Sequence, residues 1–582
     1  MAATLGIIIL AVILIQGGFY PTSYLLAAVP VGIIAFVRKG RAADLCDYLL
    51  WGLTGLYLTA SLANGYASDS LARSAFVCVC ALFLSLYRTL SESERHRMLS
   101  VVLIGSGIFS VAAILAFCHV LPLTGAVISN RLQFTFQYAN AAGSWFAAAA
   151  LLAWDWENIR VKRFTISMIT ALFLTRSVGA IGLYVCLQAV RLWIRRKDKI
   201  WHSAVILHGA AAGFAFLFYM LSGWAAVMLL ILLGVIVWCQ EKLMPAMCRL
   251  RLYWPFLLLG AAGGAAVVFT QRVASSARTF IERLIQILDG SRVIAANPLF
   301  GVGAGNWEDI YPFYQSAQYN STVVHSSIIQ IGVDAGIFAI LLAAVFFAVS
   351  WKRGKRTLPE NLALILLAVH SVFDFTMQFF PIVALLLALL FADEKDQQKG
   401  SSPQTAVVGR TAYLPSVILC ITLLYGDIQY KQLAYKAQAN DWDALETQFQ
   451  QAGVLFGQNR SAHQLYIRAL YEQGKLEETI AETEAVQRLT DEELLTRASA
   501  VYETGGGTAA CQLLLDRLSS ELYNVSLFEQ TARLFLEWDV DAACLAAYDE
   551  FAISANQSQS TLAVLKGDQV YIDTISNLGG KS

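Results

Sequence analysis

The chain has 582 residues, of which 57% are hydrophobic and only 14% are charged. Its apolar segments repeatedly reach the roughly 17–25 residues that a spanning helix needs, so a single soluble domain is excluded and a polytopic membrane protein is predicted. The 42 Lys and Arg residues balance 42 Asp and Glu residues, which leaves no basic excess that would indicate a nucleic-acid partner.

The first apolar run, residues 5–37, is predicted to form a helical hairpin because Gly17, Gly18 and Pro21 interrupt it. The run ends at a basic cluster, and Lys and Arg accumulate on the cytoplasmic side of membrane proteins. Further basic clusters lie at residues 88–97, 160–163, 195–197, 249–251 and 352–356. Placing every cluster in the cytoplasm gives an even number of crossings between consecutive clusters. This puts four features on the outer side: residues 130–138, 175–177, 271–321 and His325.

The late membrane part is predicted to be a second hairpin, because Ser371, Asp374 and Pro381 interrupt a run at residues 361–391 that is too long for one helix. Residues 393–402 then form a cytoplasmic linker. A short apolar segment, residues 413–425, carries the rest of the chain to the outside.

The tail, residues 427–582, is rich in Ala, Leu, Glu and Gln and has apolar residues at helical spacing. Turns at residues 473–475 and 504–507 favour paired helices of roughly tetratricopeptide length, and a plain helical bundle is the alternative. Cys511 and Cys544 can form a disulfide if the tail faces an oxidising space.

We therefore expect an all-α fold: a transmembrane bundle of about 13–15 helices, a large outer loop and a soluble, tetratricopeptide-like C-terminal domain. The expected segments are the N-terminal transmembrane helices at 1–122, a membrane core at 123–392 with the outer loop 271–322, a linker with the last transmembrane helix at 393–426, and an extracytoplasmic helical domain at 427–582.

Four arginines on the predicted outer side need an anion or a water-filled cavity, because an unpaired charge in or near a membrane is costly. They are Arg131, Arg176, Arg283 and Arg292. The guanidinium group matches phosphate oxygens bidentately, so together they can hold a diphosphate headgroup. The alternative is that they extend to the outer surface or pair with loop acids such as Glu282 and Asp289.

His325 is a candidate general base, because imidazole has an unperturbed pKa of about 6.5 and can take a proton from a hydroxyl near neutral pH. A helix cap or an interfacial residue is the alternative. His370 and Asp374 are four residues apart and are expected on one helix face, where they either orient another group or form a packed, hydrogen-bonded pair.

The glycines at 301, 303 and 305 do not indicate a dinucleotide loop, because no strand precedes them and no acidic residue follows in a second strand. They are better explained by a close approach of backbone to backbone or to a sugar.

Three motifs follow one another in the second half of the membrane part: NPLFGVGAGN at 297–306, VHSSIIQ at 324–330 and GVDAGI at 332–337. Three flanking segments accompany them: NRLQFTFQYAN at 130–140, LTRSVG at 174–179 and HSVFDF at 370–375. Together these segments resemble the signature of the O-antigen ligase and polymerase family of bacterial membrane glycosyltransferases. The resemblance covers about residues 130–390. Two positions depart from the family pattern, since Ser326 stands where asparagine is usual and Thr175 where serine is usual.

The resemblance implies transfer of a glycan from undecaprenyl diphosphate to an acceptor hydroxyl on the outer face of the cytoplasmic membrane, without metal or other cofactor. It implies that His325 activates the acceptor and that Arg176 and Arg283 stabilise the departing diphosphate. The substrate-binding residues are expected to be Arg131, Arg292, Tyr138, Asn140, Gly301, Gly303, Asn306, His370 and Asp374.

The expected partners are the lipid-linked glycan donor, a glycan, lipid or protein acceptor, membrane lipids, and an envelope protein bound through residues 427–582. Polymerisation, ligation and protein glycosylation all remain open, and a polymerase or ligase of a cell-surface polysaccharide is favoured. A flippase or transporter of lipid-linked sugars is a different candidate, but inverted repeats, which would support it, are not evident. An envelope scaffold that acts through the tail is a third.

Overall fold

The computed structural model describes most of the chain: residues 1–38, 43–64, 67–198, 200–249, 254–256, 258, 260, 272–392, 403–452, 459–486, 488–538, 540–557 and 572–575. Helices dominate this described part, and its two short strands, β1 (Val127–Ile128) and β2 (Arg131–Leu132), pair as one antiparallel hairpin. The predicted all-α class is confirmed.

The chain forms two compact units, each discontinuous in sequence. Unit 1 comprises residues 1–52, 76–277 and 342–420, and unit 2 comprises residues 53–75, 278–341 and 421–582. The four consecutive segments expected from the sequence stay a prediction.

Five helical segments in the described residues are long and apolar enough to cross a membrane, judged by length and composition. They are Asp69–Tyr87 in α4 (Ala67–Tyr87), α5 (Glu92–Phe117), α10 (Trp201–Met220), Gly223–Gln240 in α11 (Gly223–Arg249) and Ala412–Gln438 in α19 (Pro403–Gln438). Shorter apolar helices accompany them: α1 (Ala2–Leu14), α2 (Pro21–Val37), α6 (Ala139–Ala153), α8 (Thr165–Thr175), α9 (Val178–Ile194), α17 (Leu358–Val372) and α18 (Phe380–Leu390). Further helices outside the tail include α3 (Leu45–Ala63), η2 (Phe134–Phe136), α7 (Ile159–Arg163), η3 (Arg196–Asp198) and α16 (Ile337–Arg353).

Both predicted hairpins are present in unit 1. α1 and α2 pack together across η1 (Gln16–Gly18), where Gly17 and Gly18 have φ of 66° and 78° and Pro21 begins α2. α17 and α18 likewise pack together across η5 (Thr376–Gln378). Gly17 and Gly18 lie in the first turn, and Asp374 lies in the second, with Pro381 at the start of α18; Ser371, however, lies inside α17.

One expectation about the last membrane segment needs revision, and another is untested. The expected linker, residues 393–402, lies outside the described residues. Residues 413–425 are part of α19, which continues without a break to Gln438 and has Leu433 fully buried. The segment is longer than predicted because apolar side chains recur at helical spacing beyond residue 425.

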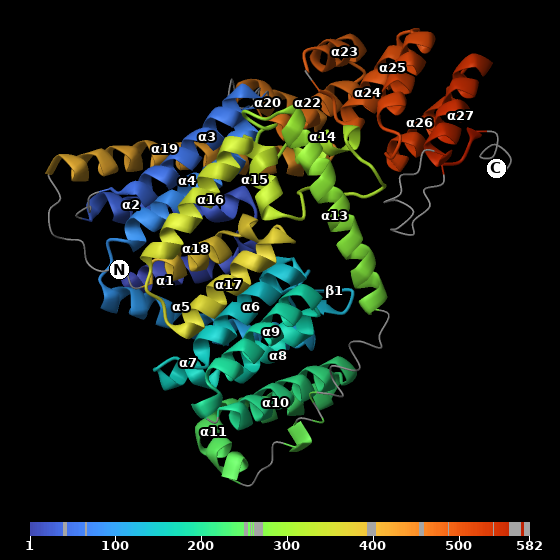
Figure 1. Cartoon of the computed structure of the whole chain (residues 1–582). Coiled ribbons are helices and arrows are strands. Elements are labelled where there is room, and N and C mark those ends of the chain that lie inside the picture. The colour runs from blue at the N-terminus through green and yellow to red at the C-terminus, as the bar shows by residue number, and fades with distance from the viewer. Residues whose placement is uncertain are drawn as a thin grey trace. The chain divides into compact units, whose positions relative to one another are not determined.

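Helix α6 is the centre of unit 1. All fifteen of its residues are buried, and it packs against α5, α8, α9 and α17 (Figure 1). Its many alanines allow neighbouring helices to approach closely. As a result, α6 provides a rigid base for the polar residues at its start.

The expected polar loop at 271–322 begins instead with a 25-residue helix, α13 (Arg272–Ala296). Its charged residues suggest a loop, yet Ile281, Ile285 and Val293 recur on one helix face and join a hydrophobic core with Trp307. Short helices follow: α14 (Trp307–Ile310), η4 (Tyr311–Phe313) and α15 (Ser327–Ala335). We call this stretch the α13–α15 segment.

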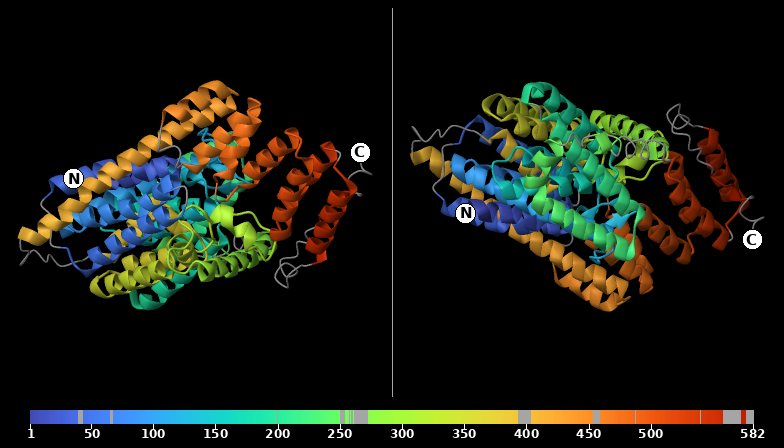
Figure 2. Two further views of the ribbon diagram at one scale, coloured as in Figure 1. Left: turned by 90° about the horizontal axis from the view of Figure 1, so that it is seen from above. Right: turned by 90° about the horizontal axis from the view of Figure 1, so that it is seen from below.

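The described part of the tail consists mainly of helices and short turns, with α20 (Trp442–Gln451), α22 (Arg460–Glu472), α23 (Leu476–Glu484), α24 (Asp491–Glu503), α25 (Gly507–Ser520), α26 (Val525–Glu537) and α27 (Ala542–Gln557). Successive helices pack on one another, and α22 also meets α24 as α25 meets α27 (Figure 2). This nearest-neighbour stacking is typical of helical repeat proteins. Its tetratricopeptide character stays a prediction.

Candidate functional site

The predicted site residues fall into two groups, one in each unit. The group in unit 1, which we call the Asn140 network, contains Arg131, Tyr138, Asn140, Arg176, His370 and Asp374. The group in unit 2, which we call the glycine–histidine loop, contains Arg283, Arg292, Gly301, Gly303, Asn306 and His325.

Asn140, in the first turn of α6, uses both ends of its side-chain amide. Its Nδ2 donates to Asp374 Oδ2 at 2.8 Å and to Tyr138 Oη at 2.8 Å. Its Oδ1 accepts from Arg131 Nη2 at 2.9 Å and from Ser177 Oγ at 2.8 Å. Tyr138 Oη in turn donates to Asp374 Oδ2 at 3.0 Å. Three segments that are distant in sequence are therefore joined by one amide.

Local turns aim the two arginines of this network. Ser129 and Asn130 have φ of 50° and 56°, as the tight turn between β1 and β2 requires, and Arg131 follows directly. Arg131 Nε donates to the Thr175 carbonyl at 3.1 Å, where α8 ends. Arg176 itself has φ of 50° and separates α8 from α9.

The side chain of Arg176 lies by α10. Its Nη1 is 3.4 Å from Tyr219 Oη, and its guanidinium lies 5.1 Å from the centre of the Tyr219 ring. The adjacent Ser177 caps α9 by accepting from the Ala180 amide at 3.5 Å. The helix break that the sequence indicated at 175–177 therefore consists of two caps: Arg176 ends α8 and Ser177 begins α9. This places the Arg176 guanidinium at the junction of two apolar helices.

His370 and Asp374 do not share a helix face as expected, because α17 ends at Val372 and Asp374 lies beyond it. His370 Nδ1 is 3.1 Å from Ser144 Oγ on α6, whereas the fully buried Asp374 accepts from Asn140 and Tyr138. Both residues therefore belong to the network through α6.

The glycine–histidine loop is built from backbone contacts. The Val302 amide donates to the Val333 carbonyl at 2.8 Å, and the Gly303 amide donates to the Asp334 carbonyl at 3.1 Å. Gly301 has φ of 59°, and a Cβ there would lie 2.2 Å from the Val333 oxygen. At Gly301 the structure therefore agrees with the prediction that a glycine lets backbone approach backbone. An added Cβ at Gly303 or Gly305 would instead meet side-chain atoms.

Gly336, in the GVDAGI motif, allows the same close approach between the glycine–histidine loop and the end of α15. A Cβ on Gly336, where φ is 82°, would lie 2.4 Å from the Leu299 oxygen, and the Ile337 amide donates to the Pro298 carbonyl at 2.9 Å. Asn306 Nδ2 donates to the Val302 carbonyl at 2.7 Å. Asn306 therefore stabilises the loop itself, and contact of Gly301, Gly303 or Asn306 with substrate stays a prediction.

His325 is held through its main chain. Its amide donates to Gln286 Oε1 at 3.0 Å, and Ser326 begins α15 as the N-cap, accepting from the Ile329 amide at 3.5 Å. Serine and asparagine are both preferred N-caps, so the departure from the family pattern at Ser326 preserves this role. The imidazole consequently projects from the residue immediately before the cap.

Gln330 fixes the same turn from the following helical turn. Its Oε1 accepts from the Val324 amide at 2.6 Å, and its Nε2 donates to Asp334 Oδ1 at 2.7 Å. Sequence reasoning missed the roles of Gln286 and Gln330, and also of Ser177. Gln330 and Ser177 lie inside quoted motifs, whereas Gln286 gave no local signal beyond its place on α13.

The two arginines of α13 differ. Arg283 and Gln286 are three residues apart and so lie on the same helix face, which places Arg283 next to the residue that holds His325. Arg292 Nη1 pairs with Asp289 Oδ1 at 2.9 Å, one of the alternatives that the sequence left open. The diphosphate role of Arg292 stays a prediction.

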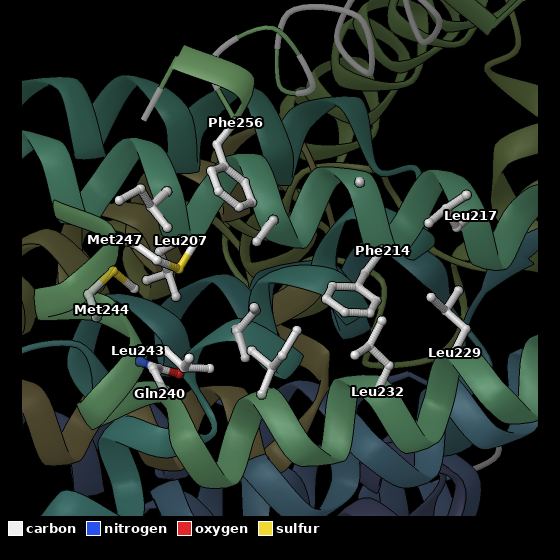
Figure 3. Close-up of a pocket in the computed structure, with 15 residues that line it drawn as sticks. Leu207, Phe214, Leu217, Leu229, Leu232, Gln240, Leu243, Met244, Met247 and Phe256 are labelled. Carbon is white, nitrogen blue, oxygen red and sulfur yellow. The ribbon is translucent and has the colours of Figure 1, made fainter. Parts of the chain in front are cut away.

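An apolar pocket of about 210 Å³ lies between α8, α10 and α11 of unit 1. In Figure 3 the Phe214 ring points toward Leu229 and Leu232, and Gln240 lies by Leu243 at the other end. Gln240 is the single side chain with a hydrogen-bonding group among the lining residues, so hydrocarbon is the chemistry that suits the pocket. Sequence reasoning could not find it, because these membrane helices are apolar on most faces.

The apolar helices of the described chain, with a polar network at the start of the buried α6, define a multi-pass helical membrane protein. Residues 210–344 match the family described as O-Antigen ligase. This match supports the resemblance to the O-antigen ligase and polymerase family that the sequence motifs predicted, for residues 210–344 of the chain. The matched residues include the glycine–histidine loop but not the Asn140 network. No curated protein matches the chain.

Proposed function

We propose that the protein transfers or polymerises a glycan carried on undecaprenyl diphosphate, at the outer face of the cytoplasmic membrane. The observation that carries this proposal is the position of His325 in the part that matches the O-antigen ligase family, hydrogen-bonded through its amide to the helix that bears Arg283. A general base must be positioned, and the backbone of His325 is fixed by hydrogen bonds at Val324, at its own amide and at Ser326.

In the proposed reaction, His325 takes the proton of the acceptor hydroxyl while the hydroxyl oxygen forms a bond to the anomeric carbon of the donor. The bond from that carbon to the diphosphate oxygen breaks, and undecaprenyl diphosphate leaves with the bonding electrons. Arg283 stabilises the charge that develops on the leaving group. Arg176 is the proposed second cation for the leaving diphosphate.

Unit 1 supports the donor part of the proposal in two ways. Asn140 fixes Arg131 beside Thr175, so the backbone that bears Arg176 is held by a second guanidinium. The pocket around Phe214 offers a surface for hydrocarbon such as a polyprenyl chain. We propose that Arg131, Tyr138, His370 and Asp374 maintain this arrangement and contribute to donor binding.

The test is transfer of a labelled undecaprenyl-diphosphate oligosaccharide by the purified protein in lipid, with chelator and without nucleotide. His325→Ala is expected to lose 100-fold or more, because a general base contributes about 10²–10⁴-fold. Arg283→Ala should lose activity as well. His202→Ala in α10 and the exposed Arg533→Ala in the tail are matched controls that should retain it.

Full activity in folded His325→Ala would remove the catalytic assignment. If the wild type binds the donor but transfers nothing, a flippase or a scaffold becomes the better account. Product analysis in the same assay separates polymerisation, which lengthens the glycan, from ligation to a different acceptor.

A further inference from the structure

Unit 2 contains a polar pocket of about 440 Å³ that the proposed reaction does not use. One wall comes from the α13–α15 segment, with Tyr311, Gln315, Gln318 and Asn320. The other wall comes from the tail, with Tyr523 in the turn between α25 and α26 and Ser526 in the first turn of α26. Its volume falls within the roughly 300–1,000 Å³ of typical ligand sites.

The chemistry of the lining indicates an uncharged, hydroxyl-rich ligand. Carboxamides and hydroxyls both donate and accept hydrogen bonds, as sugar hydroxyls do. The lining contains no Lys, Arg or His, so it is unsuited to a diphosphate, and its one carboxylate is that of Glu282.

The first wall is rigid. The Tyr311 and Tyr319 rings stack at 5.3 Å, and Trp307 stacks behind Tyr311 at 5.6 Å. Tyr319 Oη donates to the buried Asp289 carboxylate at 3.1 Å, and Gln315 Nε2 donates to the Tyr319 carbonyl at 2.7 Å. A wall fixed in this way loses little conformational entropy when a ligand binds.

The tail is attached to this wall by contacts outside the pocket. Arg460 of α22 forms an ion pair with Asp309 of α14, and the Arg517 guanidinium lies 4.3 Å from the centre of the Phe313 ring. On the tail side, Asn524 Nδ2 donates to the Glu521 carboxylate at 2.8 Å and so supports the α25–α26 turn. The pocket therefore needs both the tail and the α13–α15 segment.

We propose that this pocket binds a neutral saccharide segment of the glycan, so that the tail holds the polymer away from the reacting end. This inference rests on the proposed function for the identity of the glycan. It gives the tail a role in glycan binding and in the length of the product.

Ser526→Phe tests the inference, because Ser526 is exposed in the first turn of α26 and a phenyl ring there fills the pocket. Gln512→Phe, at an exposed position of α25, is the matched control. Asn320→Ala is a second variant that removes an exposed amide without adding bulk. The probe is the set of oligosaccharides that mild acid releases from the source cell's own surface polysaccharide, and binding to the full-length protein is measured by saturation-transfer NMR and calorimetry.

We expect Ser526→Phe to weaken binding at least 10-fold, Asn320→Ala to weaken it measurably and Gln512→Phe to leave it unchanged. In the transfer assay, Ser526→Phe should still transfer but give shorter products. No binding by the wild type, or equal binding by the wild type and Ser526→Phe, overturns the inference even if transfer is normal. Ser526-sensitive binding without any transfer sustains the saccharide site and rejects the proposed function instead.

Discussion

Replacing Gly301 by alanine tests how the glycine–histidine loop is built. The residue has φ of 59°, a conformation that costs a non-glycine residue about 1 kcal/mol. The added Cβ would lie 2.2 Å from the Val333 oxygen and 2.9 Å from the Ala335 nitrogen. Both are backbone atoms in or beside α15, so neither can rotate away as a flexible side chain would.

The loop must therefore separate from the end of α15, and the structure sets the magnitude. Separation breaks the hydrogen bonds from the Val302 and Gly303 amides, each of which contributes about 1 kcal/mol. Together with the backbone conformation, the expected cost is about 3 kcal/mol, which corresponds to a roughly 100-fold change in a local equilibrium.

Hydrogen exchange measures this opening directly at the Val302 and Gly303 amides. Both should exchange about 100-fold faster in Gly301→Ala than in the wild type. Gly474→Ala is the control, because Gly474 has φ of 74° in the same unit but has nothing within 4 Å of its added Cβ. If Gly301→Ala exchanges no faster than Gly474→Ala at these two amides, the close approach does not hold the loop.

Three further outcomes follow from buried groups. Burial raises the pKa of Asp309 to about 6, so its contribution to stability should fall as pH rises from about 4 to 6. Asp309→Asn should remove this contribution and reduce the slope of melting temperature against pH, while Glu521, whose pKa burial also raises, continues to contribute. Cys511 and Cys544 share the tail core and are within hydrogen-bonding reach, so in an oxidising space they should form a disulfide worth about 3–4 kcal/mol. A reductant-sensitive gel shift that Cys511→Ser abolishes would show it. Asn140→Ala should lower stability by about 2–4 kcal/mol, since it leaves buried partners unsatisfied; an unchanged melting temperature would contradict the network.

Local signals were sufficient where the structure depends on local chemistry. Gly17, Gly18 and Pro21 predicted the first hairpin because their allowed backbone angles suit a turn and a helix start. The same reasoning predicted that the residues around Gly301 bring backbone against backbone. The cost of an unpaired charge also predicted Asp289 as a partner of Arg292, as one of two alternatives.

Local signals failed where tertiary packing decides. Residues 272–296 were interpreted as loop from their polarity, but a single apolar face is enough to make them a helix once Trp307 packs on it. Asn140 and Asp374 are 234 positions apart, so no periodicity could pair them, and the distances became known only from the fold. The same limit applies to the pocket between Tyr311 and Ser526, whose walls come from two distant segments.

The fully buried Asp289 has a consequence for which parts of this chain can change. Its carboxylate accepts from the Ser316 amide at 3.1 Å, from Ser316 Oγ at 2.8 Å and from Tyr319 Oη at 3.1 Å, as well as from Arg292. Burial raises its pKa because it disfavours the charged form, whereas the donors from Ser316 and Tyr319 and the nearby Arg292 favour that form. The stretch after η4 is thus organised around a buried carboxyl group. Its apolar residues can drift in sequence, whereas loss of a donor at 316 or 319 would have to be matched by loss of the acid itself.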